Sequence, residues 1–150
     1  MKKFQFRMES ILRLCEFREE EKKRELASAL KFRQENQGLL TFWEQRLIQN
    51  TEGLSQEKQK GLPDVRRILA LEGYWAVLKR QIQEQSRKLA EAEKFVDQCR
   101  QKLADATRRK KTFSRLKEKQ TRAYYDSVEK WEQKSLDEWS VLHFASKAGF

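Results

Sequence analysis

The residues that could do chemistry in this chain are few, and they form no familiar reactive set. The one histidine, His143, stands near the C-terminal end, and the two cysteines, Cys15 and Cys99, are far from it in the sequence. A zinc site needs three or four ligands, and a general base needs a pocket beside its substrate. Neither a GxxxxGK[S/T] nor a GxGxxG phosphate loop occurs. The sequence therefore predicts a protein that is not an enzyme, with no catalytic residue, no cofactor and no metal.

Basic residues are the other group that could bind a partner. The formal net charge is +10, which favours attraction to nucleic acid, a membrane face or an acidic protein. Between residues 108 and 122 only Glu118 is acidic, whereas the basic residues are Arg108, Arg109, Lys110, Lys111, Arg115, Lys117, Lys119 and Arg122. This run is either a solvated helix face or a surface that meets an acidic partner.

Two long stretches repeat apolar residues every three or four positions, and the only proline, Pro63, lies between them. A strip this narrow is typical of helices that pack along another helix. In the second stretch the strip is Ile68, Leu71, Trp75, Leu78, Ile82, Gln85, Leu89, Ala92, Val96, Cys99, Leu103, Ala106, Lys110 and Phe113. In the first it is Leu12, Cys15, Glu19, Lys22, Leu26, Ala29, Arg33, Asn36, Leu40, Trp43 and Leu47. The sequence predicts an all-α fold, a two-helix antiparallel coiled-coil hairpin with a longer C-terminal helix.

We expect this hairpin to form a single coiled-coil domain over residues 1–150. Its parts are a helix over about 9–58, a turn over about 59–64, a helix over about 65–140 and a flexible tail over 141–150. Ser10 and Asp64 are the expected N-caps. Folding about residue 61 leaves everything after about residue 118 without a partner in the chain.

The segment after residue 118 is rich in aromatic and apolar residues. They are Tyr124, Tyr125, Val128, Trp131, Leu136, Trp139, Leu142 and Phe144. Tyrosine and tryptophan dominate binding hot spots, and a bare apolar face usually marks an interaction site. The sequence therefore predicts an external partner here, although a tail that folds back or dimerises stays an alternative.

The location and redox state follow from absences. No run of 18 uncharged apolar residues occurs, which argues against a transmembrane helix, and no apolar core follows Lys2 and Lys3 as in a signal peptide. We therefore expect a cytoplasmic protein. Cys15 and Cys99 fall on the strips but are about eight residues out of register, too far apart for a disulfide. We expect free, structural thiols.

Three segments resemble the FliJ family of the bacterial flagellar type III export apparatus. Residues 4–21 are similar to the family's FxFRLxxLLRLxExxE opening, and residues 74–85 resemble its second helix near the hairpin tip. Residues 113–121 and 128–139 are similar to its ending. The family's EQKxLDE motif reads here Glu132-Gln133-Lys134-Ser135-Leu136-Asp137-Glu138.

The resemblance implies a non-catalytic stalk that binds the central pore of a FliI-like export ATPase ring and promotes its function. It also implies contact with a FlhA-like export gate protein, escort of export chaperones, and a peripheral place at the cytoplasmic face of the inner membrane without insertion. The residues it marks for ATPase binding are Arg7, Arg13, Arg122, Tyr124, Tyr125, Trp131, Gln133, Lys134, Asp137 and Glu138. Those it marks for gate binding are Tyr74, Leu78, Gln81 and Gln85. For Leu78, which lies on the strip, core packing is an equal interpretation.

Two other readings stay open. The first is the equivalent stalk of a virulence type III secretion system, which would have the same architecture. The second, of another class, is a basic nucleic-acid-binding coiled coil that uses residues 108–122. We do not expect nucleic acid, because the basic residues are predicted to circle the helix and no groove-reading motif is present.

Overall fold

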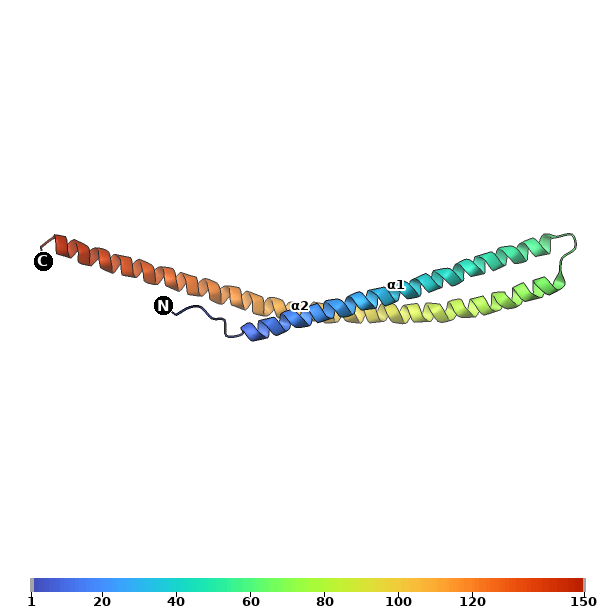
Figure 1. Cartoon of the computed structure of the whole chain (residues 1–150), viewed down its shortest axis with the longest axis horizontal. Helices are drawn as coiled ribbons and strands as arrows, with labels where there is room; N and C mark the ends of the chain where they lie inside the picture. Colours follow the sequence, from blue (N-terminus) through green and yellow to red (C-terminus); the bar gives the residue numbers. More distant parts are fainter. Residues whose placement is uncertain (1, 150) are drawn as a thin grey trace. The chain divides into compact units, whose positions relative to one another are not determined.

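The structure, a computed structural model, describes residues 2–149 and consists of two long helices joined by a short turn (Figure 1). Helix α1 runs Glu9–Gln59 and helix α2 runs Val65–Lys147, with no strand among the described residues. The helices pack against each other, which confirms the all-α hairpin with the longer second helix. The chain divides into a tip unit, Glu21–Ala104, and a terminal unit, which joins the residues up to Glu20 with those from Asp105 onward.

In the tip unit, the predicted strips are the buried faces. The buried side chains are Ala29, Asn36, Leu40, Asn50, Glu57, Leu78, Gln85, Leu89, Ala92, Val96 and Cys99. Ala29, Val96 and Cys99 form the core cluster, and Leu26 and Leu30 pack against it. Trp75 departs from the prediction, because it is 40% exposed and carries the Lys79 ammonium 5.3 Å from its ring centroid.

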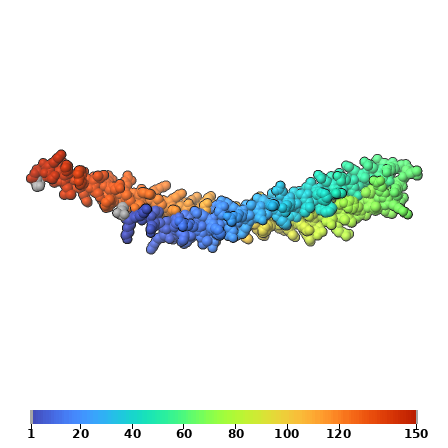
Figure 2. Space-filling view, in the orientation of Figure 1, coloured from blue at the N-terminus to red at the C-terminus, as the bar shows by residue number. Residues whose placement is uncertain are grey.

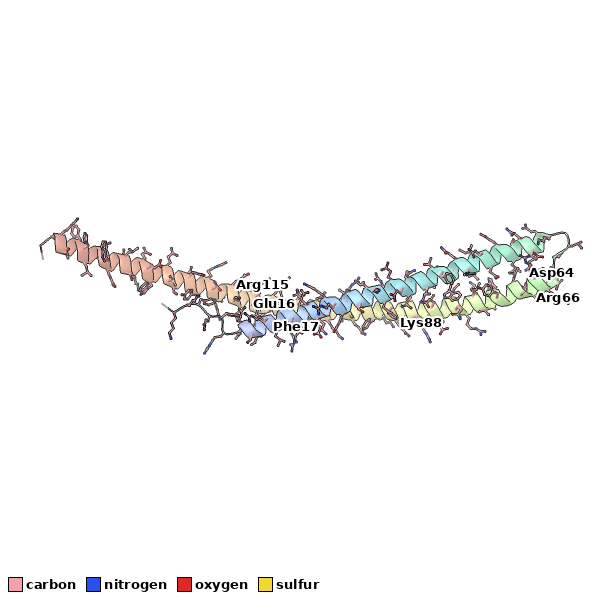
Figure 3. The ribbon with its side chains drawn as sticks, in the orientation of Figure 1. Glu16, Phe17, Asp64, Arg66, Lys88 and Arg115 are labelled. Atoms are coloured by element: carbon pink, nitrogen blue, oxygen red, sulfur yellow. The ribbon has the colours of Figure 1, made fainter. Side chains whose placement is uncertain are left out.

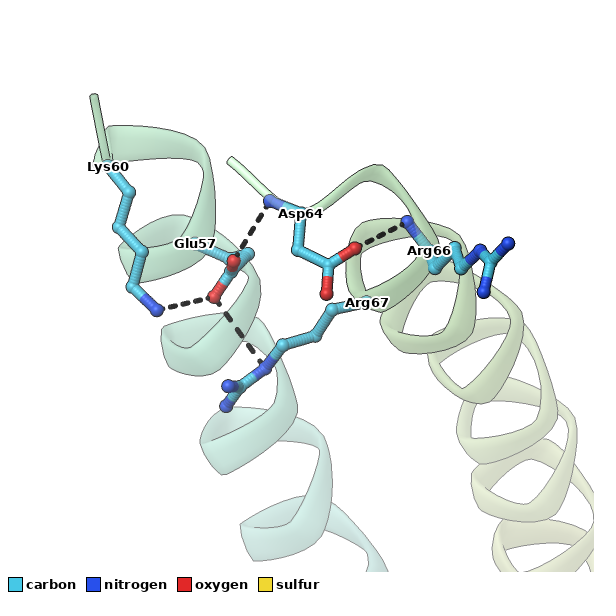
Figure 4. Close-up of polar contacts among 5 residues, drawn as sticks. All are labelled: Glu57, Lys60, Asp64, Arg66 and Arg67. Atoms are coloured by element: carbon cyan, nitrogen blue, oxygen red, sulfur yellow. Dashed lines mark hydrogen bonds and ion pairs between the residues drawn. The ribbon is translucent and has the colours of Figure 1, made fainter. Parts of the chain in front are cut away.

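The turn between the helices is organised by two carboxylates (Figure 4). The N–H of Arg66 donates to Asp64 Oδ1 at 3.0 Å, which confirms the predicted N-cap of α2. Glu57 is 3% exposed and accepts hydrogen bonds from the N–H of Asp64 at 3.2 Å and from Lys60 Nζ at 2.9 Å. Arg67 Nε lies 3.6 Å from the same carboxylate. Glu57 therefore ties the end of α1 to the start of α2.

In the terminal unit, the start of α1 packs antiparallel on α2. Leu12 and Cys15 are buried. Lys110 Nζ lies 3.2 Å from Glu19 Oε1, and Lys117 Nζ lies 2.9 Å from Glu9 Oε2. Two lysines of α2 thus pair with glutamates of α1 across the helix pair.

The segment before α1 has no regular secondary structure and also packs on α2. Phe6 is buried, the rings of Phe4 and Tyr124 have centroids 5.5 Å apart, and the Tyr124 hydroxyl donates to the Lys2 carbonyl at 2.8 Å. The expectation that α2 has no partner after about residue 118 is therefore wrong as far as Tyr124. A non-helical chain can advance up to roughly 3.3 Å per residue against 1.5 Å in a helix, so a few such residues can reach further along α2 than a helix of the same length.

The cap of α1 and the C-terminal end of α2 differ from the prediction. α1 begins at Glu9, and the N–H of Leu12 bonds to the Met8 carbonyl at 2.9 Å. Ser10 therefore lies in the first turn and is not the cap. α2 continues to Lys147, so residues 141–147 are helical and not a flexible tail. No proline or glycine interrupts α2 between Gly73 and this end, and nothing in the local sequence stops the helix at residue 140.

Two further findings bear on the predicted location and redox state. Cys15 and Cys99 are both free and buried, as expected. Over the residues that the structure describes, neither helix has a stretch long and apolar enough to span a bilayer.

The Glu57 carboxylate makes a testable contribution to stability that depends on pH. The hydrogen bond from Lys60 and then the N–H of Asp64 hold the pKa of Glu57 below its ordinary value. A lowered pKa in the folded state stabilises the protein above the pKa of the unfolded chain, and this gain is lost as the pH falls through the folded-state pKa. We expect Glu57→Gln to lower the urea midpoint at neutral pH, and the gap to wild type to close in acid.

The matched control is Glu52→Gln, an exposed glutamate on the same helix, which should leave the midpoint near wild type at both pH values. Circular dichroism at 222 nm follows the unfolding in each case. A gap between wild type and Glu57→Gln that stays the same at both pH values would contradict the assignment.

Candidate partner-binding surfaces

The free end of α2, residues 128–147, carries several large apolar side chains that are more than half exposed. Figure 2 shows this end, in orange and red, continuing past the N-terminal residues. Tyr124 is the furthest point along α2 at which a described contact joins it to the N-terminal segment. The exposed apolar residues beyond it are Trp131, Leu136, Trp139, Val141, Leu142 and Phe144, with exposed fractions from 54% to 76%. This many exposed apolar side chains on one helix indicate an interaction site.

The residues marked for ATPase binding all lie in the terminal unit, but not in one cluster. Arg13 Nε lies 3.9 Å from Glu9 Oε1, and Glu9 also pairs with Lys117 of α2, so Arg13 lies where α1 is paired with α2. Arg7 is exposed in the turn that precedes α1. The members on the free end are Trp131, Gln133, Lys134, Asp137 and Glu138, all exposed. Arg7 and Arg13 thus lie just before and within the start of α1, whereas these five residues lie beyond the last described contact between α2 and the N-terminal segment.

The two tyrosines of this set differ in environment although they are neighbours. Tyr124 is half-buried under Phe4, with its hydroxyl bonded to the backbone, whereas Tyr125 is 64% exposed. Their rings meet edge to face, with centroids 5.6 Å apart. Tyr124 therefore anchors the N-terminal segment, and Tyr125 is the one available to a partner.

One feature of the free end was not predicted. The rings of Trp139 and His143 are stacked, with centroids 5.0 Å apart and an angle of 7° between planes. Side chains four residues apart on a helix are neighbours, so the spacing of these residues was the available signal. The stack fixes a flat aromatic surface near the end of α2.

The residues marked for gate binding lie in the tip unit and divide into two kinds. Leu78 is fully buried and Gln85 is 6% exposed. Gln85 Nε2 donates to Asn36 Oδ1 at 2.9 Å and to the Asn36 carbonyl at 3.1 Å. Tyr74 and Gln81 are exposed and seven residues apart, on one flank of the helix. In this structure only Tyr74 and Gln81 offer a surface.

Exposed apolar residues of α1 lie at the same level of the hairpin as Tyr74 and Gln81. Asn36 bonds to Gln85, and Asn50 Nδ2 donates to the Leu71 carbonyl at 3.0 Å, so residues 36–50 run opposite residues 71–85. Within that span Leu39 and Phe42 are 49% and 44% exposed. Leu39 and Phe42 were not predicted as surface residues of interest because they fall beside the strip and not on it.

The basic residues of α2 between positions 108 and 122 have two different environments in the structure. Lys110 and Lys117 turn toward α1 and pair with Glu19 and Glu9, and Arg108 Nη1 lies 3.8 Å from Asp105 Oδ1. The other basic residues of the run are exposed. The basic residues of the run therefore lie both on the packed side of α2, where two lysines are paired with glutamates, and on its exposed sides.

No metal site accompanies these surfaces. Across residues 2–149 no three histidine, cysteine, aspartate or glutamate side chains gather in a way that could hold a metal ion.

One of three comparisons with known proteins identifies a family. A family model described as "Flagellar FliJ protein" matches residues 4–149, which is almost the whole chain. Neither the search of curated proteins nor that of solved structures found a match. The family match covers the N-terminal segment, both helices and the free end.

The buried amide pair gives a prediction about the tip unit. Gln85→Ala leaves the Asn36 amide buried with one partner fewer, which should cost about 1–3 kcal/mol in the free energy of unfolding. Gln83→Ala, at an exposed position two residues away, should change it by about 0.5 kcal/mol or less. The double variant Asn36→Leu/Gln85→Leu should recover most of the loss. Urea unfolding measures all three, and equal effects of the two single variants would contradict the role of the pair.

Proposed function

The chain belongs to the FliJ family and is a component of the flagellar export apparatus, and from that premise we propose that it acts as a non-catalytic stalk. In this proposal the free end of α2 binds the central pore of the export ATPase ring and promotes its hydrolysis. The tip unit contacts the export gate protein, and the chain carries no catalytic activity of its own.

The observation that carries the proposal is the free end of α2. A helix that continues past its last described intrachain contact, at Tyr124, and exposes Trp131, Trp139 and Phe144 has apolar surface to bury against another protein. Tryptophan is enriched among interface hot spots. A single helix also fits a narrow pore, whereas the paired part of the hairpin is two helices wide.

The contact with the gate protein is supported by the exposed residues at the tip. Tyr74 and Gln81 on α2, with Leu39 and Phe42 on α1, would form the surface. Leu78 and Gln85 would contribute indirectly, because their buried side chains hold the two helices in register below this surface. Direct contact by either would require the helices to part at this level.

The remaining parts of the proposal are the peripheral location at the cytoplasmic face of the inner membrane and the escort of export chaperones. The alternative of a virulence secretion stalk has less support, because the matching family model is the flagellar one. Genes for flagellar structural proteins beside the gene for this chain would separate the two systems.

Trp131→Ala tests the contact with the ATPase. The side chain is 54% exposed on the free end, so its loss should leave the helix content unchanged. Removal of a hot-spot tryptophan costs about 2 kcal/mol or more, so we expect affinity for the purified export ATPase to fall at least roughly 30-fold. Stimulation of ATP hydrolysis should fall in parallel.

The control for this variant is Phe32→Ala, which removes an aromatic side chain of similar exposure, 53%, from the tip unit. It should stimulate the ATPase as well as wild type. Full stimulation by Trp131→Ala would disprove the assignment of Trp131, and no stimulation by the wild-type chain would disprove the stalk.

Tyr74→Ala tests the contact with the gate protein. It should weaken binding to the cytoplasmic part of that protein, measured by calorimetry, by roughly ten-fold. It should leave ATPase stimulation intact, because Tyr74 lies in the tip unit. Leu69→Ala, at another exposed apolar position on α2, is the control, and equal losses in the two variants would argue against a local gate surface.

A further inference from the structure

Five cations of α2 form a straight row on the side of the helix that faces away from α1. They are Arg108, Lys111, Arg115, Lys119 and Arg122, which we call the basic stripe. Successive members are three or four residues apart, so they fall within roughly a quarter of the helix circumference and extend over about 21 Å. Lys110 and Lys117, which contact α1, mark the opposite side.

The stripe is exposed and mostly unneutralised. All five side chains are exposed, and Arg115 is labelled in Figure 3. Within the described residues no ion pair involves Lys111, Arg115, Lys119 or Arg122, and Arg108 has only a long, exposed contact with Asp105 at 3.8 Å. Like charges three and four residues apart on a helix repel each other. The repulsion within this row therefore destabilises the helix, and a bound polyanion would reduce that repulsion.

The chemistry of the stripe selects among the polyanions. The other residues on this face between the first and last member are Thr112 and Glu118, so the face has no apolar centre. Protein interfaces are built around an apolar or aromatic core with charged residues depleted, which makes an acidic protein a poor fit. A surface made of phosphate groups needs no such core.

The shape of the stripe then separates the two kinds of phosphate surface. A helix that enters the major groove of a duplex has phosphates on both of its flanks, and single strands are held by aromatic stacking. The stripe is one-sided and has no aromatic member. A row of cations along one face of a helix instead matches a flat surface that the helix can lie against, with α1 on the far side.

We propose that the basic stripe binds the anionic headgroups of a phospholipid bilayer. Juxtaposed lysine and arginine side chains attract anionic lipids electrostatically without insertion of the helix, and salt screens the attraction. The inference goes beyond the stalk function. It gives the proposed peripheral location a surface, and rests on that proposal only for the identity of the membrane.

The test uses the full chain and vesicles of phosphatidylcholine mixed with phosphatidylglycerol, with pure phosphatidylcholine vesicles beside them. Sedimentation should show binding to the mixed vesicles only, weakened by added salt. The variant Lys111→Gln/Arg115→Gln/Lys119→Gln removes three charges and should lower the affinity about 100-fold. Arg108 and Arg122 stay in place, because Arg122 is also marked for ATPase binding.

The matched control is Arg80→Gln/Lys88→Gln/Lys94→Gln, which removes one arginine and two lysines from exposed positions of α2 in the tip unit. It should bind the mixed vesicles within a few-fold of wild type. Equal losses in the two triple variants would show attraction by net charge alone and overturn the proposal. Failure of the wild-type chain to bind the mixed vesicles would overturn it as well.

Two further arms separate this proposal from its neighbours. Tighter binding of the wild-type chain to duplex DNA or RNA than to the mixed vesicles, lost in the stripe variant, would assign the stripe to nucleic acid and overturn the lipid proposal. Stimulation of the export ATPase should be the same for wild type and both triple variants. If the wild-type chain stimulates the ATPase but does not bind the vesicles, only the lipid proposal is disproved. If it binds the vesicles but does not stimulate the ATPase, only the stalk proposal is disproved.

Discussion

A pair of helices can bury only one strip on each partner, and this constraint governs the whole molecule. Where the helices are paired, about every third or fourth residue is buried or partly buried, and the other faces of both helices stay in water. In the tip unit the strip includes Ala29, Val96 and Cys99 as its apolar centre, but no deeper core exists from which to build an enclosed site. A partner of this chain must therefore bind to the outer surface of a helix. The exposed aromatic and basic residues are for this reason the candidate binding groups.

Because the strip is so narrow, its polar members determine which residues face each other. Asn36 and Gln85 satisfy each other in the tip unit, and Glu19 meets Lys110 in the terminal unit. A shift of either helix by one turn would leave these polar groups buried without partners. Burying an unpaired polar group costs free energy, so the paired register is favoured even where another register would bury as much apolar surface. A buried amide at one strip position is a known way to specify register in coiled coils. The apolar residues supply the attraction, and the polar pairs supply the alignment.

The helices and their contact faces were predictable because a repeat of three and four is a property of the sequence itself. The cap at Asp64 was predictable for the same reason, since capping is local. Two features were missed. Tyr124 is covered because the segment before α1 packs along α2. Trp75 is exposed although it falls on the repeat. The partner sites are harder still, because the partner decides which exposed row is used.

The two cysteines have a consequence for how local motion in this protein can be followed. Cys15 lies in the terminal unit and Cys99 in the tip unit, and both are buried as free thiols. A buried thiol reacts with an alkylating reagent only when its surroundings open. The rate of labelling at each sulfur thus reports the opening equilibrium of its own stretch of paired helix. Because each unit contains one buried cysteine, local opening of the terminal unit can be distinguished from local opening of the tip unit without adding a probe.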